Sequence, residues 1–320
     1  MSRLRTSNQI MASLWELINK KFEAARGSGH LVFTESTSQV EDFHGVKYLY
    51  TLAPKLHKKP NAEKKPDSGA PKLLQSPWIK PEPELTVVDE FESNYRIVLN
   101  KFAIVPNHFL LVTKEQEPQK APLSPEDLAA AYKALNGVNS SAPSGTRFVG
   151  FYNAGPHSGA SIDHKHIQFV PLPLADGYYP FVDELVKINQ GFTDTQKPLI
   201  DHRMAFAHFI VPIDKNPDQD HLGFRYSHLL SRVMTTLREH EVPPAEISYN
   251  FLFTEEWMMA VPRKSSETDG RGFNSLSMIG MLLAKSEDDI TYFKEKGPGH
   301  IVAELGFAPV DERKEEDYDY

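Results

Sequence analysis

A segment rich in glycine, serine and histidine lies between two apolar runs and constrains the fold more than any other part of the chain. The segment covers residues 153–168 and reads NAGPHSGASIDHKHIQ, and the apolar runs flank it at 147–152 and 169–173. Short apolar runs of this kind predict strands. Glycine lets a backbone approach a ligand closely, serine adds a hydroxyl group, and histidines two apart on a strand point the same way. The pattern therefore predicts a phosphate-binding turn followed by either a nucleophilic histidine or a pair of metal ligands.

The rest of the chain alternates between helical and strand-like patterns. Helices are predicted at 7–26, from Ser124 to about Leu135, at 181–188 and at 221–241. Strands are predicted at 30–33, 46–50, 95–102, 108–113, 147–152, 166–172, 206–212, 249–254 and 257–263. Pro106-Asn107 suits a tight turn between two of these strands, which favours an antiparallel pair. The expected fold class is α/β (α+β), with a mixed, largely antiparallel sheet flanked by helices.

We expect residues 1–310 to form a single catalytic unit. An apolar strand pattern leads to Val-Pro at both 95–106 and 249–262, which suggests two related halves, about 1–175 and 176–310. Prolines and lysines alternate between residues 54 and 84, and this composition predicts an irregular loop. The last ten residues, 311–320, are acidic and predict a disordered tail.

The composition excludes several classes of protein. The net charge is −8, which does not favour a nucleic-acid partner. The chain has no cysteine, so disulfides, thiolate zinc sites and cysteine nucleophiles are all excluded. No apolar run approaches the roughly 20 residues that a membrane-spanning helix needs. We therefore expect a protein of the cytoplasm, or also of the nucleus, with neither nucleic acid nor membrane as a partner. We also expect a monomer, although the composition does not bear on the oligomeric state.

Metal binding is the weaker of the two interpretations of the opening segment. His157, His164 and His166 offer imidazole ligands, and Asp163 offers a carboxylate. A structural zinc normally takes four ligands, and without cysteine the remaining ones would have to come from distant residues. We therefore predict no metal site within the protein itself.

A nucleophilic histidine explains more of the pattern. Imidazole is a competent nucleophile near neutral pH because its ordinary pKa is about 6.5, provided that an acceptor holds its other ring nitrogen. His164 would share a strand face with His166 and help to stabilise or orient it. Gln168, next on that face, offers an amide to a phosphoryl oxygen. Glutamine does not deliver a proton to a leaving group as a third histidine would, which favours transfer of a nucleotide to an acceptor other than water.

The residues at 164–168 resemble the His-x-His-x-Gln signature of the nucleotidyltransferase branch of the histidine triad superfamily. Within that branch, the chain is most similar to the fungal diadenosine tetraphosphate phosphorylases, also called ATP adenylyltransferases. The similar segments are 155–161, 163–168, 99–102 with 105–106, 261–263 and 274–285. The resemblance covers about residues 15–310, and it implies a histidine-triad-like sheet. The basic insertion at 61–80 differs from the family.

The resemblance implies the activity and the site residues. It implies phosphorolysis of diadenosine 5′,5‴-tetraphosphate to ATP and ADP through a nucleotidyl-histidine, reverse adenylyl transfer, and exchange of ADP with phosphate or sulfate. His166 would be the nucleophile, with Gln168 and His164 as its catalytic partners, and His157 would shape the turn. The implied substrate-binding residues are Lys59, Asn100, Lys101, Asn153, Ser158, Gly159, Ala160, Ser161, Gln168, Asn274, Ser275, Leu276, Met281 and Lys285.

The expected partners are small molecules: diadenosine polyphosphates, inorganic phosphate, ATP and ADP. Because the chain is acidic and polyphosphate is strongly negative, we expect a divalent cation, Mg²⁺, to accompany the substrate. Two alternatives stay open. A hexose-1-phosphate uridylyltransferase is disfavoured by the absence of cysteine zinc ligands, and a nucleotide-binding sensor without turnover is disfavoured by the presence of both His166 and Gln168.

Overall fold

An eight-stranded antiparallel sheet organises the computed structural model, which describes residues 10, 13–58, 76–172, 177–189 and 197–309. Its strand order is β3-β4-β5-β7-β6-β9-β10-β8, and every neighbouring pair is antiparallel. The strands are β3 (Thr86–Phe91), β4 (Tyr95–Leu99), β5 (Phe109–Thr113), β6 (Arg147–Ala154), β7 (His166–Leu172), β8 (Phe209–Pro212), β9 (Tyr249–Phe253) and β10 (Trp257–Pro262). The expected fold class is confirmed.

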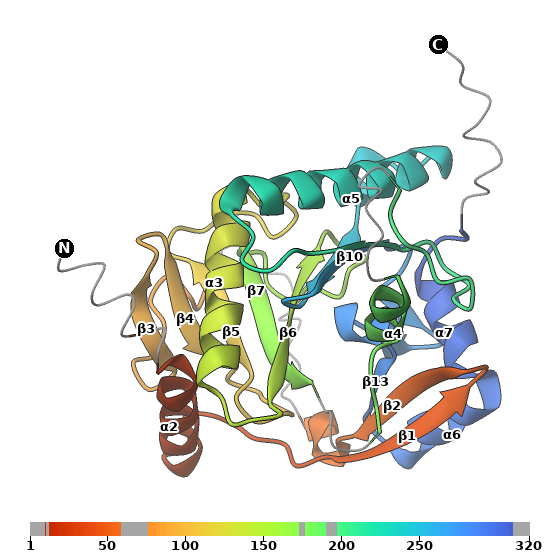
Figure 1. Cartoon of the computed structure of the whole chain (residues 1–320). Helices are drawn as coiled ribbons and strands as arrows, with labels where there is room; N and C mark the ends of the chain where they lie inside the picture. The colour runs from red at the N-terminus through yellow and green to blue at the C-terminus, as the bar shows by residue number, and fades with distance from the viewer. Residues whose placement is uncertain (1–9, 11–12, 59–75, 173–176, 190–196, 310–320) are drawn as a thin grey trace, which may run out of the picture.

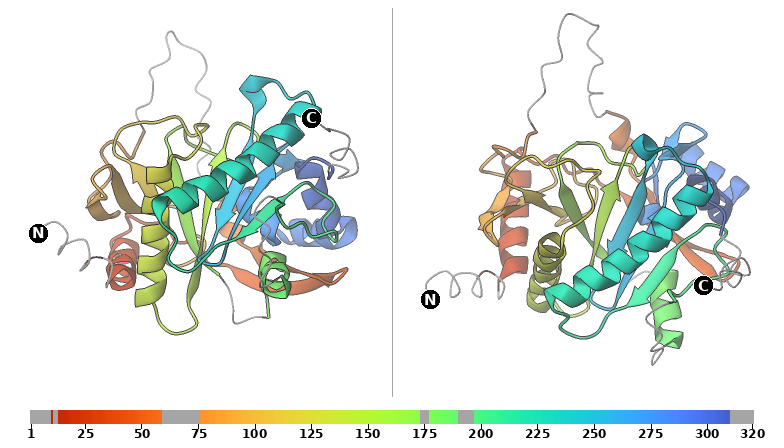
Figure 2. Two further views of the ribbon diagram at one scale, coloured as in Figure 1. Left: turned by 45° about the horizontal axis from the view of Figure 1, so that its top comes forward. Right: turned by 90° about the horizontal axis from the view of Figure 1, so that it is seen from above.

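Three helices cover one face of this sheet. They are α2 (Leu14–Gly27), α3 (Pro125–Ser141) and α5 (Gln219–Glu239), and Figures 1 and 2 show α3 and α5 lying across the strands. Ser124 caps α3, because its hydroxyl accepts a hydrogen bond from the Asp127 N–H and the Asp127 carboxylate accepts one from the Ser124 N–H. The remaining elements cover the opposite face.

A smaller sheet and three further helices cover the opposite face of the large sheet. The smaller sheet has the order β1-β2-β13, with β1 antiparallel and β13 parallel to β2. Its strands are β1 (Thr37–Phe43), β2 (Val46–Leu52) and β13 (Met281–Ala284), and the helices are α4 (Phe181–Ile188), α6 (Glu287–Lys296) and α7 (Pro298–Leu305). Short elements complete the chain: η1 (Pro54–Lys58), η2 (Pro244–Glu246), η3 (Ser275–Ile279), β11 (Glu267–Thr268) and β12 (Arg271–Gly272).

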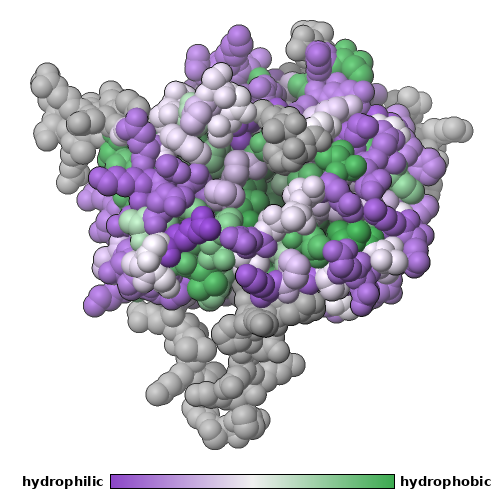
Figure 3. Space-filling model, turned by 90° about the horizontal axis from the view of Figure 1, so that it is seen from below, coloured by the Kyte–Doolittle hydropathy of each residue, from purple (hydrophilic) through white to green (hydrophobic). Residues whose placement is uncertain are grey.

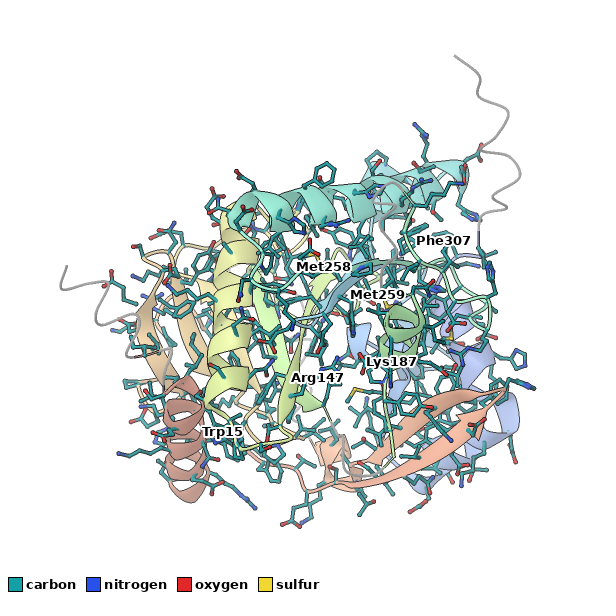
Figure 4. All side chains as sticks on the ribbon, viewed as in Figure 1. Trp15, Arg147, Lys187, Met258, Met259 and Phe307 are labelled. Atoms are coloured by element: carbon teal, nitrogen blue, oxygen red, sulfur yellow. The ribbon has the colours of Figure 1, made fainter. Side chains whose placement is uncertain are left out.

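The central strands are buried on both faces, so consecutive apolar residues enter opposite cores. Met258 and Met259 of β10 illustrate this alternation: Met258 belongs to the cluster under α3 and α5, and Met259 to the cluster under α4, α6 and α7 (Figure 4). A third, small cluster of Val98, Leu110 and Val112 lies on the second face. That face therefore carries two separate apolar regions.

In the part of the chain that the structure describes, no helix is long and apolar enough to cross a bilayer. On the face seen in Figure 3, described apolar residues reach the surface in patches between hydrophilic ones, and the surface is hollowed near its centre.

Two similar strand-helix-hairpin units meet at the β6–β9 pair. One is β5-α3-β6-β7 and the other is β8-α5-β9-β10, and their strands occupy mirrored places in the strand order. This is the arrangement that two related halves would give, and duplication stays a hypothesis. The two Val-Pro pairs do not support it, because Val105-Pro106 lies in the connection after β4 whereas Val261-Pro262 lies within β10.

Several local expectations were wrong. Residues 30–33 form no strand; the Val32 and Thr34 N–H groups instead donate to the Lys101 and Ala103 carbonyls from a loop. Helix α3 continues past Asn136-Gly137 to Ser141, because Gly137 and Val138 are buried by packing that outweighs the local stop signal. Strands β1, β3 and β13 and helices α6 and α7 were not expected. Residues 59–75 of the proline-rich loop and the tail at 311–320 lie outside the described residues.

Candidate active site

A strip of polar side chains crosses the second face of the large sheet, between the two apolar regions of that face. It runs from β5 to the end of β10, and its members alternate with residues of the core under α3 and α5. The strip consists of His108, His166, Gln168, Asn153, Asn250 and Arg263. Because a buried sheet face is normally apolar, a polar strip in this position marks a candidate site.

His166 is the first residue of β7, and its hydrogen bonds fix its tautomer. Its Nδ1 lies 2.7 Å from the carbonyl oxygen of His164. A carbonyl only accepts, so Nδ1 carries the proton and Nε2 carries the lone pair. No described residue hydrogen-bonds to Nε2. Burial lowers the pKa of His166 to about 4, so the ring is neutral and nucleophilic at physiological pH.

Gln119 joins the start of β7 to the end of β6. Its Oε1 accepts a hydrogen bond from the His166 N–H at 2.8 Å, and its Nε2 donates to the Asn153 carbonyl at 2.9 Å and to the His166 carbonyl at 3.2 Å. This buried amide thus fixes the backbone that carries His166. No sequence pattern indicated Gln119, because it lies in a loop far from the histidine motif.

His164 supports His166 through its backbone rather than through its ring. The His164 ring is fully buried, and its Nε2 donates to the Thr113 carbonyl at 2.8 Å while Nδ1 pairs with the Ser76 hydroxyl at 2.7 Å. Burial lowers the pKa of His164, which keeps this ring neutral as well. Since both ring nitrogens have protein partners, the His164 ring is not open to a substrate, and His164 orients the His166 ring through its backbone carbonyl.

Trp78 covers the two histidines from the described end of the proline-rich loop. The centroid of its indole lies 4.5 Å from that of the His166 ring and 5.6 Å from that of the His164 ring. Arg96 holds this segment by donating to the Trp78 carbonyl at 3.3 Å. The predicted loop therefore contributes an aromatic wall to the site, which its composition did not indicate.

Gln168 belongs to a hydrogen-bonded chain with His108 and Asn100. The His108 Nε2 lies 3.1 Å from the Gln168 Oε1, and the Asn100 Nδ2 lies 3.0 Å from the His108 Nδ1. Donation from Asn100 to His108 and from His108 to Gln168 satisfies both contacts, and it leaves the Gln168 Nε2 group for another acceptor. His108 was not among the predicted residues. Lys101, beside Asn100, is exposed and pairs with Glu82 at 2.6 Å.

Asn153 lies at the end of β6 on the same face as His166. Its Oδ1 accepts three hydrogen bonds: from the Asn250 Nδ2 at 3.1 Å, from the Ser275 N–H at 3.2 Å and from the Ser275 hydroxyl at 2.5 Å. Ser275 thus contributes to the site through Asn153, and its predicted place among the substrate-binding residues stays a prediction. Ser275 is fully buried, and its hydroxyl is used by Asn153.

The glycine-rich turn after β6 is built from its own polar groups. The Ser158 hydroxyl donates to the Gly155 carbonyl at 2.6 Å, and the side chain is fully buried. The Ser158 hydroxyl is therefore used within the turn, and the role of Ser158 in substrate binding stays a prediction. The His157 N–H donates to the Ser248 hydroxyl at 3.0 Å, in line with the predicted role of His157 in the turn.

A groove of about 570 Å³ opens beside this turn, over the smaller sheet. Five predicted substrate-binding residues line it: Gly159, Ala160, Asn274, Met281 and Lys285. Gly159 has φ +88°, and a Cβ there would lie 2.8 Å from the Phe273 carbonyl oxygen, so only glycine fits. The wall of the groove joins the histidine site through Asn274 and the adjacent Ser275.

The remaining predicted residues lie around or outside this groove. Ser161 is exposed on the loop before His164. The Leu276 N–H donates to the Asn274 Oδ1 at 3.0 Å, so Asn274 caps η3. Lys59 lies outside the described residues. His166 does not line the groove. Among the described residues, no group of three or more histidine, aspartate or glutamate side chains could hold a metal ion.

His166 is a neutral, buried imidazole with amide donors beside it, and a groove with a lysine at its wall lies next to it. These features define the class of site, which is a centre for nucleotidyl transfer through histidine. The family profiles agree. Residues 5–186 match the Ap4A phosphorylase N-terminal domain, and residues 202–308 match the ATP adenylyltransferase C-terminal domain. The chain belongs to the Ap4A phosphorylase/ATP adenylyltransferase family.

Two curated proteins of Saccharomyces cerevisiae are similar to nearly the whole chain. The protein APA1 is 35% identical over 328 residues, which covers 97% of this chain and 99% of that protein. Diadenosine 5′,5‴-P1,P4-tetraphosphate phosphorylase 2 is 35% identical over 332 residues, which covers 97% and 100%.

Solved structures of yeast Ap4A phosphorylase Apa2 share the fold. The crystal structure without a named ligand has a TM-score of 0.82 at 32% identity and covers 93% of this chain and 98% of that one. The structure in complex with Ap4A has a TM-score of 0.79 at 31% identity and covers 92% and 98%.

Proposed function

We propose that this protein cleaves diadenosine 5′,5‴-tetraphosphate with inorganic phosphate to give ATP and ADP, through a nucleotidyl-histidine on His166. The observation that carries this proposal is the hydrogen bond from the His166 Nδ1–H to the His164 carbonyl, at 2.7 Å. This bond presents the Nε2 lone pair and stabilises the positive charge that forms on the ring as it attacks. Membership of the family supplies the substrate class.

The first step transfers an adenylyl group to the protein. The His166 Nε2 attacks the phosphorus next to one adenosine, an N–P bond forms, and the P–O bond to the remaining triphosphate breaks, so that ATP leaves. The Gln168 Nε2 group and the Asn153 Nδ2 group lie on the same sheet face and donate to the oxygens of the transferring phosphoryl group. Because both are fixed before the substrate binds, catalysis is mainly positioning and charge stabilisation.

The second step moves the adenylyl group to an acceptor. An oxygen of inorganic phosphate attacks the phosphorus, the N–P bond breaks, ADP leaves, and His166 returns to its neutral form. In the reverse direction, ADP gives its adenylyl group to His166 and releases phosphate, and a terminal oxygen of ATP then accepts that group to re-form the dinucleotide. The same intermediate exchanges ADP with phosphate or with sulfate. The Gln168 amide donates hydrogen bonds but transfers no proton in these steps. This favours anionic acceptors over water, which would have to lose a proton.

Three further properties are proposals. A divalent cation, Mg²⁺, enters with the polyphosphate, whose oxygens supply most of its ligands and whose charge it reduces. The lysines Lys59, Lys101 and Lys285 take up the rest of the negative charge. The protein acts as a monomer, in the cytoplasm or also in the nucleus.

The test is incubation of the protein with diadenosine tetraphosphate, with and without phosphate, followed by measurement of ATP and ADP. Equal amounts of both products that depend on phosphate are expected, and His166→Ala is expected to abolish them while the protein stays folded. Turnover of a uridine diphosphate sugar, with no cleavage of the dinucleotide, would instead indicate the uridylyltransferase. Binding of dinucleotide without labelled adenylate on the protein would indicate a sensor.

A further inference from the structure

A chain of buried hydrogen bonds runs beneath the candidate site from Arg263 through Asn250 to Asn153. The Arg263 Nη1 donates to the Asn250 Oδ1, and the Asn250 Nδ2 donates to the Asn153 Oδ1 at 3.1 Å. Arg263 follows β10 and is 1% exposed, Asn250 lies in β9 and is 0% exposed, and Asn153 lies in β6 and is 2% exposed. Asn153 and Asn250 lie directly opposite each other in the β6–β9 register.

Groups that can only donate fix the direction of these hydrogen bonds. A guanidinium only donates, so the Asn250 atom that contacts Arg263 is its oxygen, and the Asn250 nitrogen faces Asn153. The Ser275 backbone N–H likewise only donates, so the Asn153 atom that it contacts is its oxygen. The Asn153 Nδ2 then lies on the other side of the planar amide. No described residue accepts a hydrogen bond from it.

An unpartnered amide donor on a residue this deeply buried is uncommon, and it indicates a place for an acceptor that the protein itself does not supply. His166 lies near it on the same sheet face, since Gln119 ties the backbones of both residues together. A phosphoryl oxygen attached to a group on His166 is an acceptor of the right chemistry. The amide of Asn153 therefore donates to that oxygen only if it is held in this orientation.

Arg263 adds a charge to this arrangement. Among the described residues it has no carboxylate partner; its other N–H groups donate to the carbonyls of Leu305 at 3.3 Å, Ser265 at 2.7 Å and Phe273 at 3.3 Å. Burial lowers the pKa of Arg263 to about 9, so it stays protonated at neutral pH. Buried charges are usually paired with an opposite charge. The positive charge of Arg263 polarises the Asn250 and Asn153 amides, which strengthens donation from the Asn153 N–H groups to an anion.

We infer that Asn250 is a positioning residue for adenylyl transfer: anchored by Arg263, it holds the Asn153 amide with its N–H groups toward the phosphoryl group on His166. The inference rests on the proposed function and extends it to a residue that was not among those predicted from the sequence. Asn250 does not touch the substrate in this scheme; it acts through Asn153.

The substitution Asn250→Asp tests this inference, because it keeps the shape of the side chain and the contact with Arg263. The new carboxylate accepts from Arg263 and does not donate to the Asn153 oxygen. We expect the rate at which labelled adenylate appears on His166, after a quench without acid, to fall about 10- to 100-fold, the usual size of one lost buried hydrogen bond or two.

A double-mutant cycle separates positioning from a general structural effect. The Asn250 Nδ2 also donates to the Ser158 carbonyl at 2.9 Å, and Asn250→Asp loses this bond in either background. In an Asn153→Ala background, Asn250→Asp is therefore expected to lower the labelling rate by a clearly smaller factor than in wild type, because no amide is left to position. Asn139→Asp is the matched control; this residue of α3 donates to Glu255 at 2.9 Å, away from the site, and its labelling rate is expected to equal that of wild type. Thermal unfolding checks that each variant is folded.

Equal losses in the two backgrounds would overturn the inference and assign Asn250 a structural role. If Asn250→Asp does not fold, Asn250→Ala takes its place in the same cycle with the same two expected outcomes. The wild-type protein separates the two levels of the proposal. A wild type that takes no label contradicts the proposed function and this inference together, whereas a labelled wild type with an additive cycle contradicts the inference alone.

Discussion

The indole of Trp78 lies against the imidazole of His166, with 4.5 Å between the ring centroids. The two residues are far apart in sequence, and the contact closes one side of the nucleophile with an apolar surface. Trp78 also packs on the small apolar cluster of Val98, Leu110 and Val112, which holds it in place. An apolar wall beside the reacting atoms restricts access of water to an adenylyl group on His166.

Replacing Trp78 with alanine should therefore raise hydrolysis relative to phosphorolysis. Water would reach the adenylyl-histidine and release AMP, whereas in wild type phosphate takes the group and ADP is released. We expect the ratio of AMP to ADP to rise about 3- to 10-fold, a change of the order of 1 kcal/mol in relative barrier heights. Trp15→Ala is the control, since Trp15 packs on Phe148 on the opposite face. The same ratio in both variants would show that Trp78 does not control water access.

The glutamine at position 168 should also affect the choice of acceptor. Gln168→His supplies a group that delivers or accepts a proton, so a water molecule can be activated and a leaving oxygen protonated. Water-dependent cleavage should rise relative to phosphorolysis, by about 10-fold or more, within the usual range for general acid-base catalysis. The measurement is product analysis at several phosphate concentrations. An unchanged product ratio would contradict the assignment.

Buried neutral histidines should make the protein sensitive to acid. Burial lowers the pKa of His166 and of His208 to about 4, below the ordinary value of about 6.5. Between these two pH values the unfolded chain binds protons that the folded chain does not. The contribution of the two histidines to the free energy of unfolding is therefore fully present above pH 6.5 and is lost as the pH falls toward 4. Each histidine contributes a slope of up to about 1.4 kcal/mol per pH unit in that window.

His208→Gln isolates one of the two contributions. Glutamine can accept from the Asp201 N–H and donate to the Phe206 carbonyl as His208 does, but it does not titrate. Urea unfolding at pH 7.0, 6.0 and 5.0 should show a shallower loss of stability for this variant than for wild type. Parallel curves for the two proteins would mean that His208 takes up no proton on unfolding.

Lys165, which lies between His164 and His166, anchors the histidine motif on the sheet face that α3 covers. The Lys165 Nζ lies 2.5 Å from the Glu117 carboxylate and 3.0 Å from that of Asp127, which is buried. Lys165→Met leaves the Asp127 charge without this partner and should lower the free energy of unfolding by about 3–5 kcal/mol. Lys294→Met, which breaks an exposed pair with Glu41, should cost less than about 1 kcal/mol. Equal costs in denaturant unfolding would contradict this account.

The sequence predicted most of the fold because its signals are local. Apolar periodicity and end signals placed β2, β6, β7, α4, α5 and the β9–β10 hairpin within a few residues. It failed where tertiary contacts override a local preference. His30–Phe33 has strand-like composition but lies outside both sheets, and Asn136-Gly137 reads as a stop although α3 packs tightly through it.

For the site, the sequence by itself determined the family and located the candidate histidine motif and the glycine turn, because these are contiguous strings of residues with a fixed chemical meaning. Only the tertiary structure decided which side chains complete the site. Gln119, Trp78, His108 and Asn250 reach it from loops and strands distant in sequence, through sheet register and the path of the loops. Ser158 and Ser275 were placed among the substrate-binding residues by the family resemblance, and only the structure shows where their hydroxyls point. The fold directs both to protein acceptors, because a buried hydroxyl must be satisfied wherever the backbone places it.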